Sequence, residues 1–273
     1  MIKTDQLRQH IYTVCSEYDR LTVRQLFYRL VSLYGYPNLP KFYKRMDWHL
    51  VQLRREDPEL NAKFIDTTRA LIEPPRAWDG AELWVEKDTI RTFLEDLARE
   101  YRVRLQMQRG FGSLTMYRDA LERAVQEGVE KILYVGDFDP SGLCIESVTE
   151  REMELEIARI ALTHEQAKGL PAQRVKRMDS RARKYIARYG DRCWEVEALD
   201  PKELRRIVEG TLQEIVPREH LREAGLRDNS AVIASDIIRP LYQRLQEEVY
   251  RLLLQELPED EIKRRLAERF GLM

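Results

Sequence analysis

The spacing of apolar residues divides the chain into two stretches, separated by residues 73–80. Before this segment, apolar residues recur every three or four positions, which is the repeat of one helix face. The repeat predicts helices over residues 5–18, 22–33 and 41–56. Thr22 and Gln25 form a capping box at the start of the second helix. Residues 60–73 have the pattern of short extended segments around a polar turn, and three helices followed by a small hairpin predict a winged helix.

The segment 73–80, EPPRAWDG, contains two adjacent prolines and a glycine and is the predicted domain boundary. After it, short apolar runs alternate with amphipathic stretches. The predicted strands are residues 82–86, 103–108 and 131–137, and the predicted helices are residues 88–101, 113–128 and 143–162. Strands that alternate with helices of this length indicate a parallel, doubly wound sheet, so the expected fold class is α/β.

The remainder of the chain has a mainly helical pattern. One further strand is predicted at residues 193–199, and residues 228–256 have the pattern of a long amphipathic helix that Pro240 should interrupt. The predicted domains are a winged helix over residues 1–78, a parallel-sheet domain over 79–217 and a helical segment over 218–273.

Composition places the chain among globular proteins, with 43% hydrophobic and 34% charged residues in a length of 273. No apolar run approaches the ~20 residues that span a bilayer, so no membrane association is expected. The N-terminus has no apolar segment followed by a small-residue cleavage site. The three cysteines lie far apart without metal-finger spacing, and we expect reduced thiols in a cytoplasmic, nucleoid-associated protein.

The distribution of charge along the chain suggests a function that the overall composition does not. The formal net charge of -1 does not by itself suggest a nucleic-acid-binding protein, but residues 20–55 and 168–188 are strongly basic. Basic stretches on a neutral chain suit the tracking of a phosphate backbone, although a solvated helix face has the same composition. The candidate DNA-contacting residues of the first stretch are Arg20, Arg29, Lys41, Lys44 and Arg45.

Two of the predicted strands end in acidic residues. Glu86 ends the first strand, and Asp137 ends the apolar run KILYVGD, with Asp139 two residues further on. Ligands gather at the carboxyl ends of the strands in an open parallel sheet, and clustered carboxylates repel one another without a cation. Mg²⁺ prefers such oxygen ligands, so Glu86, Asp137 and Asp139 are candidate magnesium ligands. The alternative is that Glu86 caps the next helix and Asp139 begins an ordinary turn.

The ordered motifs resemble a known family. VEKD at 85–88, RGFGSLTMYRDAL at 109–121 and YVGDFDPSG at 134–142 are similar to the Toprim domain of topoisomerases, primases and some nucleases. More narrowly, they resemble the A subunit of type IIB topoisomerases (topoisomerase VI) and the related meiotic transesterase that makes double-strand breaks. In that family a winged helix carries a catalytic tyrosine in an Arg-x-x-x-Tyr helix, and TVRQLFYRL supplies Arg24 and Tyr28. The resemblance covers roughly residues 20–200.

The resemblance implies a DNA-cleaving transesterase of the isomerase class, with Tyr28, Arg24 and Glu86 as catalytic residues and Mg²⁺ as cofactor. The substrate would be double-stranded DNA, left with a 5′-phosphotyrosyl end. In the family, the tyrosine of one subunit meets the metal of the other, so a homodimer is implied. Nearby alternatives to Tyr28 are Tyr12, Tyr34, Tyr36 and Tyr43, and Glu197 is a weaker candidate for a further metal ligand.

The chain also departs from the family. It is shorter than the usual A subunit, and it has no Gly-x-x-x-x-Gly-Lys-Ser/Thr loop or other recognisable ATPase motif. Strand passage would therefore need a separate GHKL-type ATPase partner, unless the protein is a reduced, stand-alone version of the A subunit from bacteria or mobile elements. Two alternatives remain open: a Toprim-type nuclease that uses metal-activated water, and a DNA-binding protein without catalysis.

Overall fold

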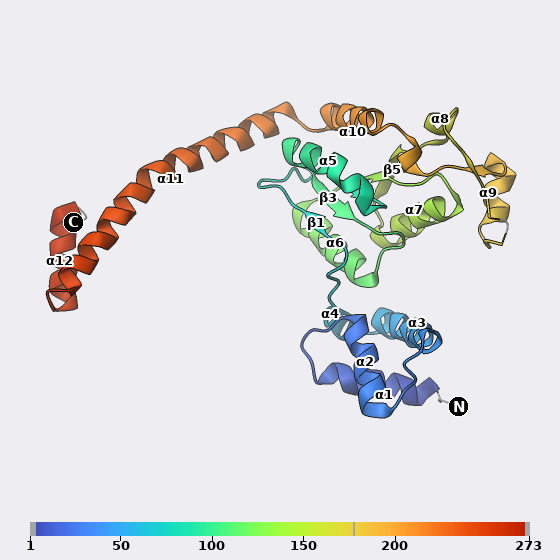
Figure 1. Cartoon of the computed structure of the whole chain (residues 1–273), viewed down its shortest axis with the longest axis horizontal. Coiled ribbons are helices and arrows are strands. Elements are labelled where there is room, and N and C mark those ends of the chain that lie inside the picture. The colour runs from blue at the N-terminus through green and yellow to red at the C-terminus, as the bar shows by residue number, and fades with distance from the viewer. Residues whose placement is uncertain (1–3, 177, 271–273) are drawn as a thin grey trace. The chain divides into compact units, whose positions relative to one another are not determined.

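The structure is a computed structural model that describes residues 4–176 and 178–270. The chain forms two compact units, one ending at Val216 and the other beginning at Pro217. The first unit contains a helical N-terminal part and a five-stranded sheet with interleaved helices, and the second contains two helices (Figure 1). The structure is therefore an α/β fold with N-terminal and C-terminal helices.

Four helices make up the N-terminal part: α1 (Thr4–Ser16), α2 (Val23–Tyr34), α3 (Pro40–Glu56) and α4 (Pro58–Ala62). The predicted capping box of α2 is confirmed, because Thr22 Oγ accepts from the Gln25 N–H and the Gln25 side chain accepts from the Thr22 N–H. The apolar faces of α1, α2 and α3 close on one core that includes Leu7, Leu26 and Leu50. Burial of the predicted apolar faces therefore holds these helices together.

The expected hairpin of the winged helix is wrong for residues 60–73. The short helix α4 occupies the first of these positions, Leu21 and Phe64 form an isolated parallel bridge, and β1 (Leu71–Ile72) pairs antiparallel with β3. Asp57 ends α3 and caps α4 by accepting from the Leu60 N–H. The prediction of an extended segment fails at its start because Pro58 in the first turn and the Asp57 cap favour a helix there.

The sheet has the order β1-β3-β2-β4-β5, and its last four strands in this order are parallel. They are β2 (Ala81–Val85), β3 (Arg104–Met107), β4 (Lys131–Val135) and β5 (Glu156–Ala161). Helices α6 (Leu114–Glu127) and α7 (Pro140–Met153) share one buried cluster with Trp84 and Tyr134. Helix α5 (Asp88–Glu100) packs against β2 and β3, and α10 (Pro201–Ile215) packs against α5 and β5.

The predicted helix over 143–162 is wrong in its second half. Helix α7 ends at Met153, Glu154 adopts a left-handed φ of 52°, and residues 156–161 form β5 beside β4. The sequence EIARIA does not alternate between polar and apolar residues, and it is the pairing with β4 that makes this segment a strand. The predicted strand 193–199 is likewise short: β7 (Arg192–Cys193) pairs with β6 (Gln173–Arg174), and residues 196–198 form a 3-10 turn.

Four further helices complete the described part of the chain. They are α8 (His164–Ala167) and α9 (Ala182–Tyr189) in the first unit, and α11 (Arg218–Leu253) followed by α12 (Glu259–Phe270) in the second. The predicted interruption at Pro240 is wrong, because α11 continues through it. A proline costs the helix one hydrogen bond to the carbonyl four residues earlier, and a long helix can bend without ending there. None of the helices in the described part of the chain is long and apolar enough to cross a membrane.

Candidate active site

Two of the three predicted acidic ligands lie next to each other at the carboxyl ends of two neighbouring strands in the interior of the sheet. Strands β2 and β4 are parallel neighbours, so Glu86 and Asp137, which follow them, emerge at the same end. The Glu86 Oε2 accepts hydrogen bonds from the Asp137 N–H at 3.1 Å and from the Tyr134 hydroxyl at 3.3 Å. Both carboxylates are buried, with 8% and 7% of each residue exposed.

Asp139 is the N-cap of α7. Its Oδ1 accepts from the Gly142 N–H at 2.6 Å, so Asp139 begins a helix and not the isolated turn that was the alternative prediction. A Cβ on Gly142 would lie 2.2 Å from the Asp137 carbonyl oxygen, so the Asp-Pro-Ser-Gly sequence can approach the Asp137 backbone only with glycine at this position.

Burial and mutual repulsion disfavour the charged forms of these acids. Burial raises the pKa of Glu86 to about 7, and the charges of Asp137 and Asp139 act in the same direction. Burial also raises the pKa of Asp137, although the Val196 N–H and Lys87 oppose it. A nearby cation would stabilise the charged forms of these buried, mutually repelling carboxylates.

Lys87 supplies such a positive charge from within the chain. Its Nζ lies 3.0 Å from Asp137 Oδ2, 3.0 Å from Glu197 Oε2 and 3.3 Å from Glu195 Oε2. Glu197, the weaker candidate for a further metal ligand, is an ion-pair partner of Lys87. Sequence reasoning missed this cluster because residues 195–197 lie far along the chain, and only the turn after β7 brings them to Lys87.

Fewer carboxylates are placed to bind a magnesium ion than the sequence predicts. Among the described residues, no group of three or more His, Cys, Asp or Glu side chains is placed to hold a metal ion. Glu86 and Asp137 do fit Mg²⁺, because this ion commonly binds through one or two carboxylates and completes its shell with water and substrate phosphates. Asp139 has one carboxylate oxygen engaged in the helix cap.

The predicted tyrosine and arginine lie on the exposed face of α2. Arg24 and Tyr28 are one helical turn apart, and the Arg24 Nη2 donates to the Tyr28 hydroxyl at 3.4 Å. The guanidinium carbon lies 5.6 Å from the centre of the tyrosine ring. Tyr28 is 42% exposed, so its hydroxyl is accessible to a macromolecular substrate.

The neighbouring tyrosines are less suited to nucleophilic attack. Tyr36 is buried and hydrogen-bonded to His10 at 2.9 Å, and Tyr34 stacks on the same histidine with ring centres 3.7 Å apart. Burial raises the pKa of Tyr43. Tyr12 is exposed, but burial of its hydroxyl and the adjacent Asp57 raise its pKa, which opposes the phenolate. Tyr28 alone among these five lies beside a guanidinium that donates to its hydroxyl.

The predicted DNA-contacting residues do not form one uniform surface. Arg20, Lys41 and Lys44 are exposed, whereas Arg29 and Arg45 are half-buried. The Arg29 guanidinium carbon lies 5.9 Å from the Tyr18 ring centre, and its Nε is buried without a hydrogen-bond partner. Arg29 is therefore less available to DNA than the other residues.

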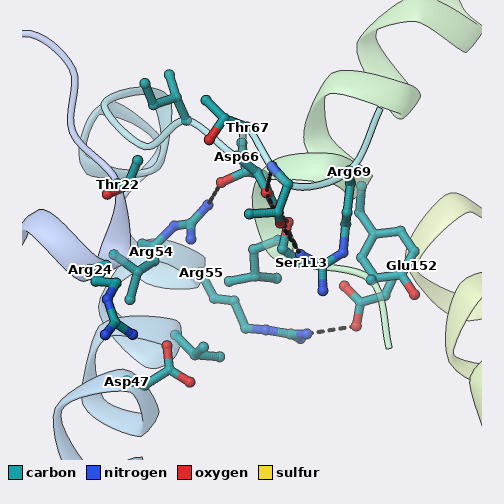
Figure 2. A pocket seen from close by; sticks show the side chains of 18 of the residues that line it. Thr22, Arg24, Asp47, Arg54, Arg55, Asp66, Thr67, Arg69, Ser113 and Glu152 are labelled. Atoms are coloured by element: carbon teal, nitrogen blue, oxygen red, sulfur yellow. Dashed lines mark hydrogen bonds and ion pairs between the residues drawn. The ribbon is translucent and has the colours of Figure 1, made fainter. Parts of the chain in front are cut away.

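A cavity of about 550 Å³ lies between the N-terminal helices and the sheet domain, close to Arg24 (Figure 2). Its wall is formed by the starts of α2 and α6, one face of α3, residues 65–69 and the end of α7. Arg55 on α3 and Glu152 on α7 form an ion pair of 2.6 Å across it. No sequence signal indicated this cavity, because its five segments are brought together only by tertiary structure.

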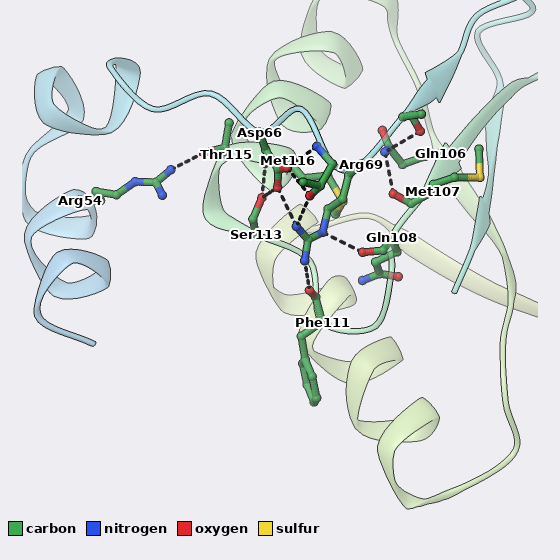
Figure 3. A network of polar contacts seen from close by, with 12 residues as sticks. Arg54, Asp66, Arg69, Gln106, Met107, Gln108, Phe111, Ser113, Thr115 and Met116 are labelled. Atoms are coloured by element: carbon green, nitrogen blue, oxygen red, sulfur yellow. Dashed lines mark hydrogen bonds and ion pairs between the residues drawn. The ribbon is translucent and has the colours of Figure 1, made fainter. Parts of the chain in front are cut away.

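One wall of the cavity is a polar network centred on Arg69 (Figure 3). The Arg69 guanidinium donates to the backbone oxygens of Gln108, at 2.8 Å, and Phe111, at 3.0 Å, and pairs with Asp66 at 2.7 Å. Asp66 accepts from Ser113 Oγ at 2.6 Å. The network fixes the RGFGS loop, which leaves β3 beside Glu86, where the Gly110 N–H donates to the Glu86 carbonyl.

Within one chain, the two halves of the candidate site have separate partners. The Tyr28 hydroxyl accepts from Arg24, whereas the Glu86 and Asp137 carboxylates are engaged with Tyr134, Lys87 and backbone N–H groups of the sheet domain. No protein-family model matches the chain, and no match is found among curated proteins.

Proposed function

We propose that the protein cleaves duplex DNA by transesterification through Tyr28, acting as a homodimer. The observation that carries the proposal is the pairing of an exposed tyrosine with Arg24 on α2, in a chain that also gathers Glu86 and Asp137 at the end of the sheet. The sequence resemblance to the A subunit of topoisomerase VI also supports the proposal, because it rests on the same residues.

In the proposed reaction the Tyr28 hydroxyl gives its proton to solvent and its oxygen forms a bond to a backbone phosphorus. The bond from that phosphorus to the 3′-oxygen of the neighbouring nucleotide breaks, and this oxygen takes up a proton from solvent to become a 3′-hydroxyl. The product is a 5′-phosphotyrosyl end, and the reverse reaction reseals the strand. Arg24 stabilises the negative charge that develops on the phenolic oxygen and on the phosphate. Glu86 and Asp137 would hold Mg²⁺, which would supply positive charge to offset the negative charge of the phosphate.

The test is Tyr28→Phe. This change should abolish covalent attachment of the protein to 5′ DNA ends while leaving DNA binding within about twofold, because the lost hydroxyl makes one long hydrogen bond to an exposed arginine. Denatured reactions on end-labelled duplex DNA with Mg²⁺ report the covalent complex. Tyr12→Phe is the matched control, since Tyr12 is also exposed and should remain active. Full cleavage by Tyr28→Phe would contradict transesterification and favour water as the nucleophile.

A second candidate function is DNA binding without catalysis. The ion pairs of Lys87 favour it. The lysine ammonium group already forms ion pairs with Asp137, Glu195 and Glu197, at the position where a metal ion would otherwise offset their charge. Binding of duplex DNA with no cleavage under any Mg²⁺ concentration would support this alternative.

A further inference from the structure

The cavity beside Arg24 has an unusual balance of charge. The arginines in its wall outnumber the carboxylates by two; they are Arg24, Arg54, Arg55, Arg69 and Arg151, against Asp47, Asp66 and Glu152. Asp66 is paired with Arg69, and Glu152 is shared by Arg55 and Arg151. The remaining cations, Arg24 and Arg54, form no ion pair in the part of the chain that the structure describes.

Arg54 is the buried one of these two cations, with only 5% of the residue exposed. Its Nε donates to Asn61 Oδ1 at 2.9 Å and its Nη2 donates to Thr115 Oγ at 2.7 Å, both neutral acceptors. Burial and the nearby Arg118 lower the pKa of Arg54 to about 10, so it stays charged at neutral pH. The charges of Asp47, Asp119 and Asp66 oppose this shift, but none of the three forms an ion pair with Arg54 in the described chain. A buried cation without a direct ion pair is costly, and an anion in the cavity would relieve that cost.

Two helix N-termini add to the positive potential. Thr22 and Ser113, the N-caps of α2 and α6, both line the cavity, and the first residues of each helix lie with them. The N-terminal ends of these 12- and 14-residue helices carry partial positive charge. The positive ends of two helices and a buried guanidinium without a direct ion pair therefore meet in a cavity of about 550 Å³.

Asp47 opposes this potential. It lines the cavity, and in the described chain it forms no hydrogen bond and no ion pair within 4 Å. Burial raises its pKa, and the charge of Arg54 acts in the opposite direction. Figure 2 shows Asp47 and Arg54 on the same side of the cavity, both carried by α3. Removing the Asp47 charge therefore breaks no hydrogen bond or ion pair in the described chain, although it removes an attraction to Arg54.

We propose that this cavity binds a phosphate oxyanion, with Arg54 and Arg24 as its principal ligands. A backbone phosphate of the bound DNA strand is the expected source, because Arg24 lines the cavity and also donates to Tyr28. This choice of source rests on the proposed function, whereas the binding of an oxyanion rests on the cavity alone.

The first test titrates inorganic phosphate into the full chain by calorimetry, without Mg²⁺ or DNA. Asp47→Asn should tighten binding by about tenfold and Arg54→Gln should weaken it by at least about tenfold, because each removes one charge near the ligand in a partly buried site. Asp5→Asn and Arg206→Gln, exposed residues outside the cavity wall, are the matched controls and should change nothing.

The opposite signs distinguish a ligand site from a structural contact, since a purely structural Arg54 predicts no tightening by Asp47→Asn. Thermal unfolding checks that Arg54→Gln is folded; if it is not, Arg54→Lys and Asp47→Asn decide the question. Phosphate affinity that stays within twofold in Asp47→Asn and in the folded Arg54 variant would overturn the proposal.

The second test identifies the source of the phosphate. If it is DNA, inorganic phosphate competes with duplex binding, and Arg54→Gln reduces the slope of log affinity against log salt by about 1. If it is a free phosphate compound, the slope stays the same and inorganic phosphate still binds at saturating DNA. Tyr28→Phe should leave phosphate binding intact, so a failure of the cleavage proposal can be told apart from a failure of this one.

Discussion

Asp66 ties the linker after α4 to the sheet domain. It accepts from Ser113 Oγ and Thr68 Oγ, both at 2.6 Å, and pairs with Arg69 at 2.7 Å, with 12% of its side chain exposed. Burial alone would raise the pKa of this carboxyl, but the hydrogen bonds from Ser113 and Thr68, together with Arg69, lower it to about 2. The folded state therefore favours the ionised form.

This depressed pKa predicts a pH-dependent loss of stability in Asp66→Asn. The contribution is fully present above the ordinary aspartate pKa of 3.8 and disappears as the pH falls through about 2. At pH 7 the variant should lose about 2 kcal/mol of unfolding free energy, and at pH 3 about half of that. Urea titrations at each pH measure the difference. Asp96→Asn, which is exposed, is the control; an Asp66→Asn deficit that stays constant from pH 7 to pH 3 would contradict the argument.

At the scale of elements, helix starts could be predicted from the sequence, whereas the pairing of strands could not. Thr22 and Gln25 marked the start of α2, because a helix cap acts within one turn. Strand β5 was missed, since its identity depends on hydrogen bonds to β4 more than twenty residues earlier. The strand-end positions of Glu86 and Asp137 followed from strand order, whereas the partners of Lys87 depended on where a distant turn folds back.

The first turn of α7 gives a prediction at this scale. Gly142→Ala should destabilise the protein by about 2 kcal/mol or more, because the new Cβ would meet the Asp137 carbonyl oxygen at 2.2 Å. Displacement of that carbonyl should also lower cleavage. Gly210→Ala on α10 is the matched control, with open space around the new atom, and should stabilise by about 0.5–1 kcal/mol. Urea unfolding compares them, and equal stability of the two variants would count against this account of the turn.

At the scale of the whole molecule, the proposed reaction needs two chains. A mixture of Tyr28→Phe and Glu86→Gln proteins, each inactive alone, should recover cleavage of one DNA strand, because one of the two sites in the mixed dimer then combines a normal tyrosine with normal acids. A nicked-circle assay on supercoiled DNA detects it. No recovery in mixtures shown to contain mixed dimers would mean that each site is built within a single chain.

The edges of the sheet constrain how two copies could associate. Strand β1, at one edge, has only two residues, and the pairing of β5 with β4 at the other edge shifts register after Tyr134. The Gln166 side chain donates to the Ile160 carbonyl of β5 at 3.0 Å, and α10 packs against the same strand. Short, irregular or covered edges resist strand addition. A continuous sheet running through two copies is therefore disfavoured, and assembly should depend on side-chain surfaces whose charge and shape evolution can adjust without disturbing the hydrogen-bonded core.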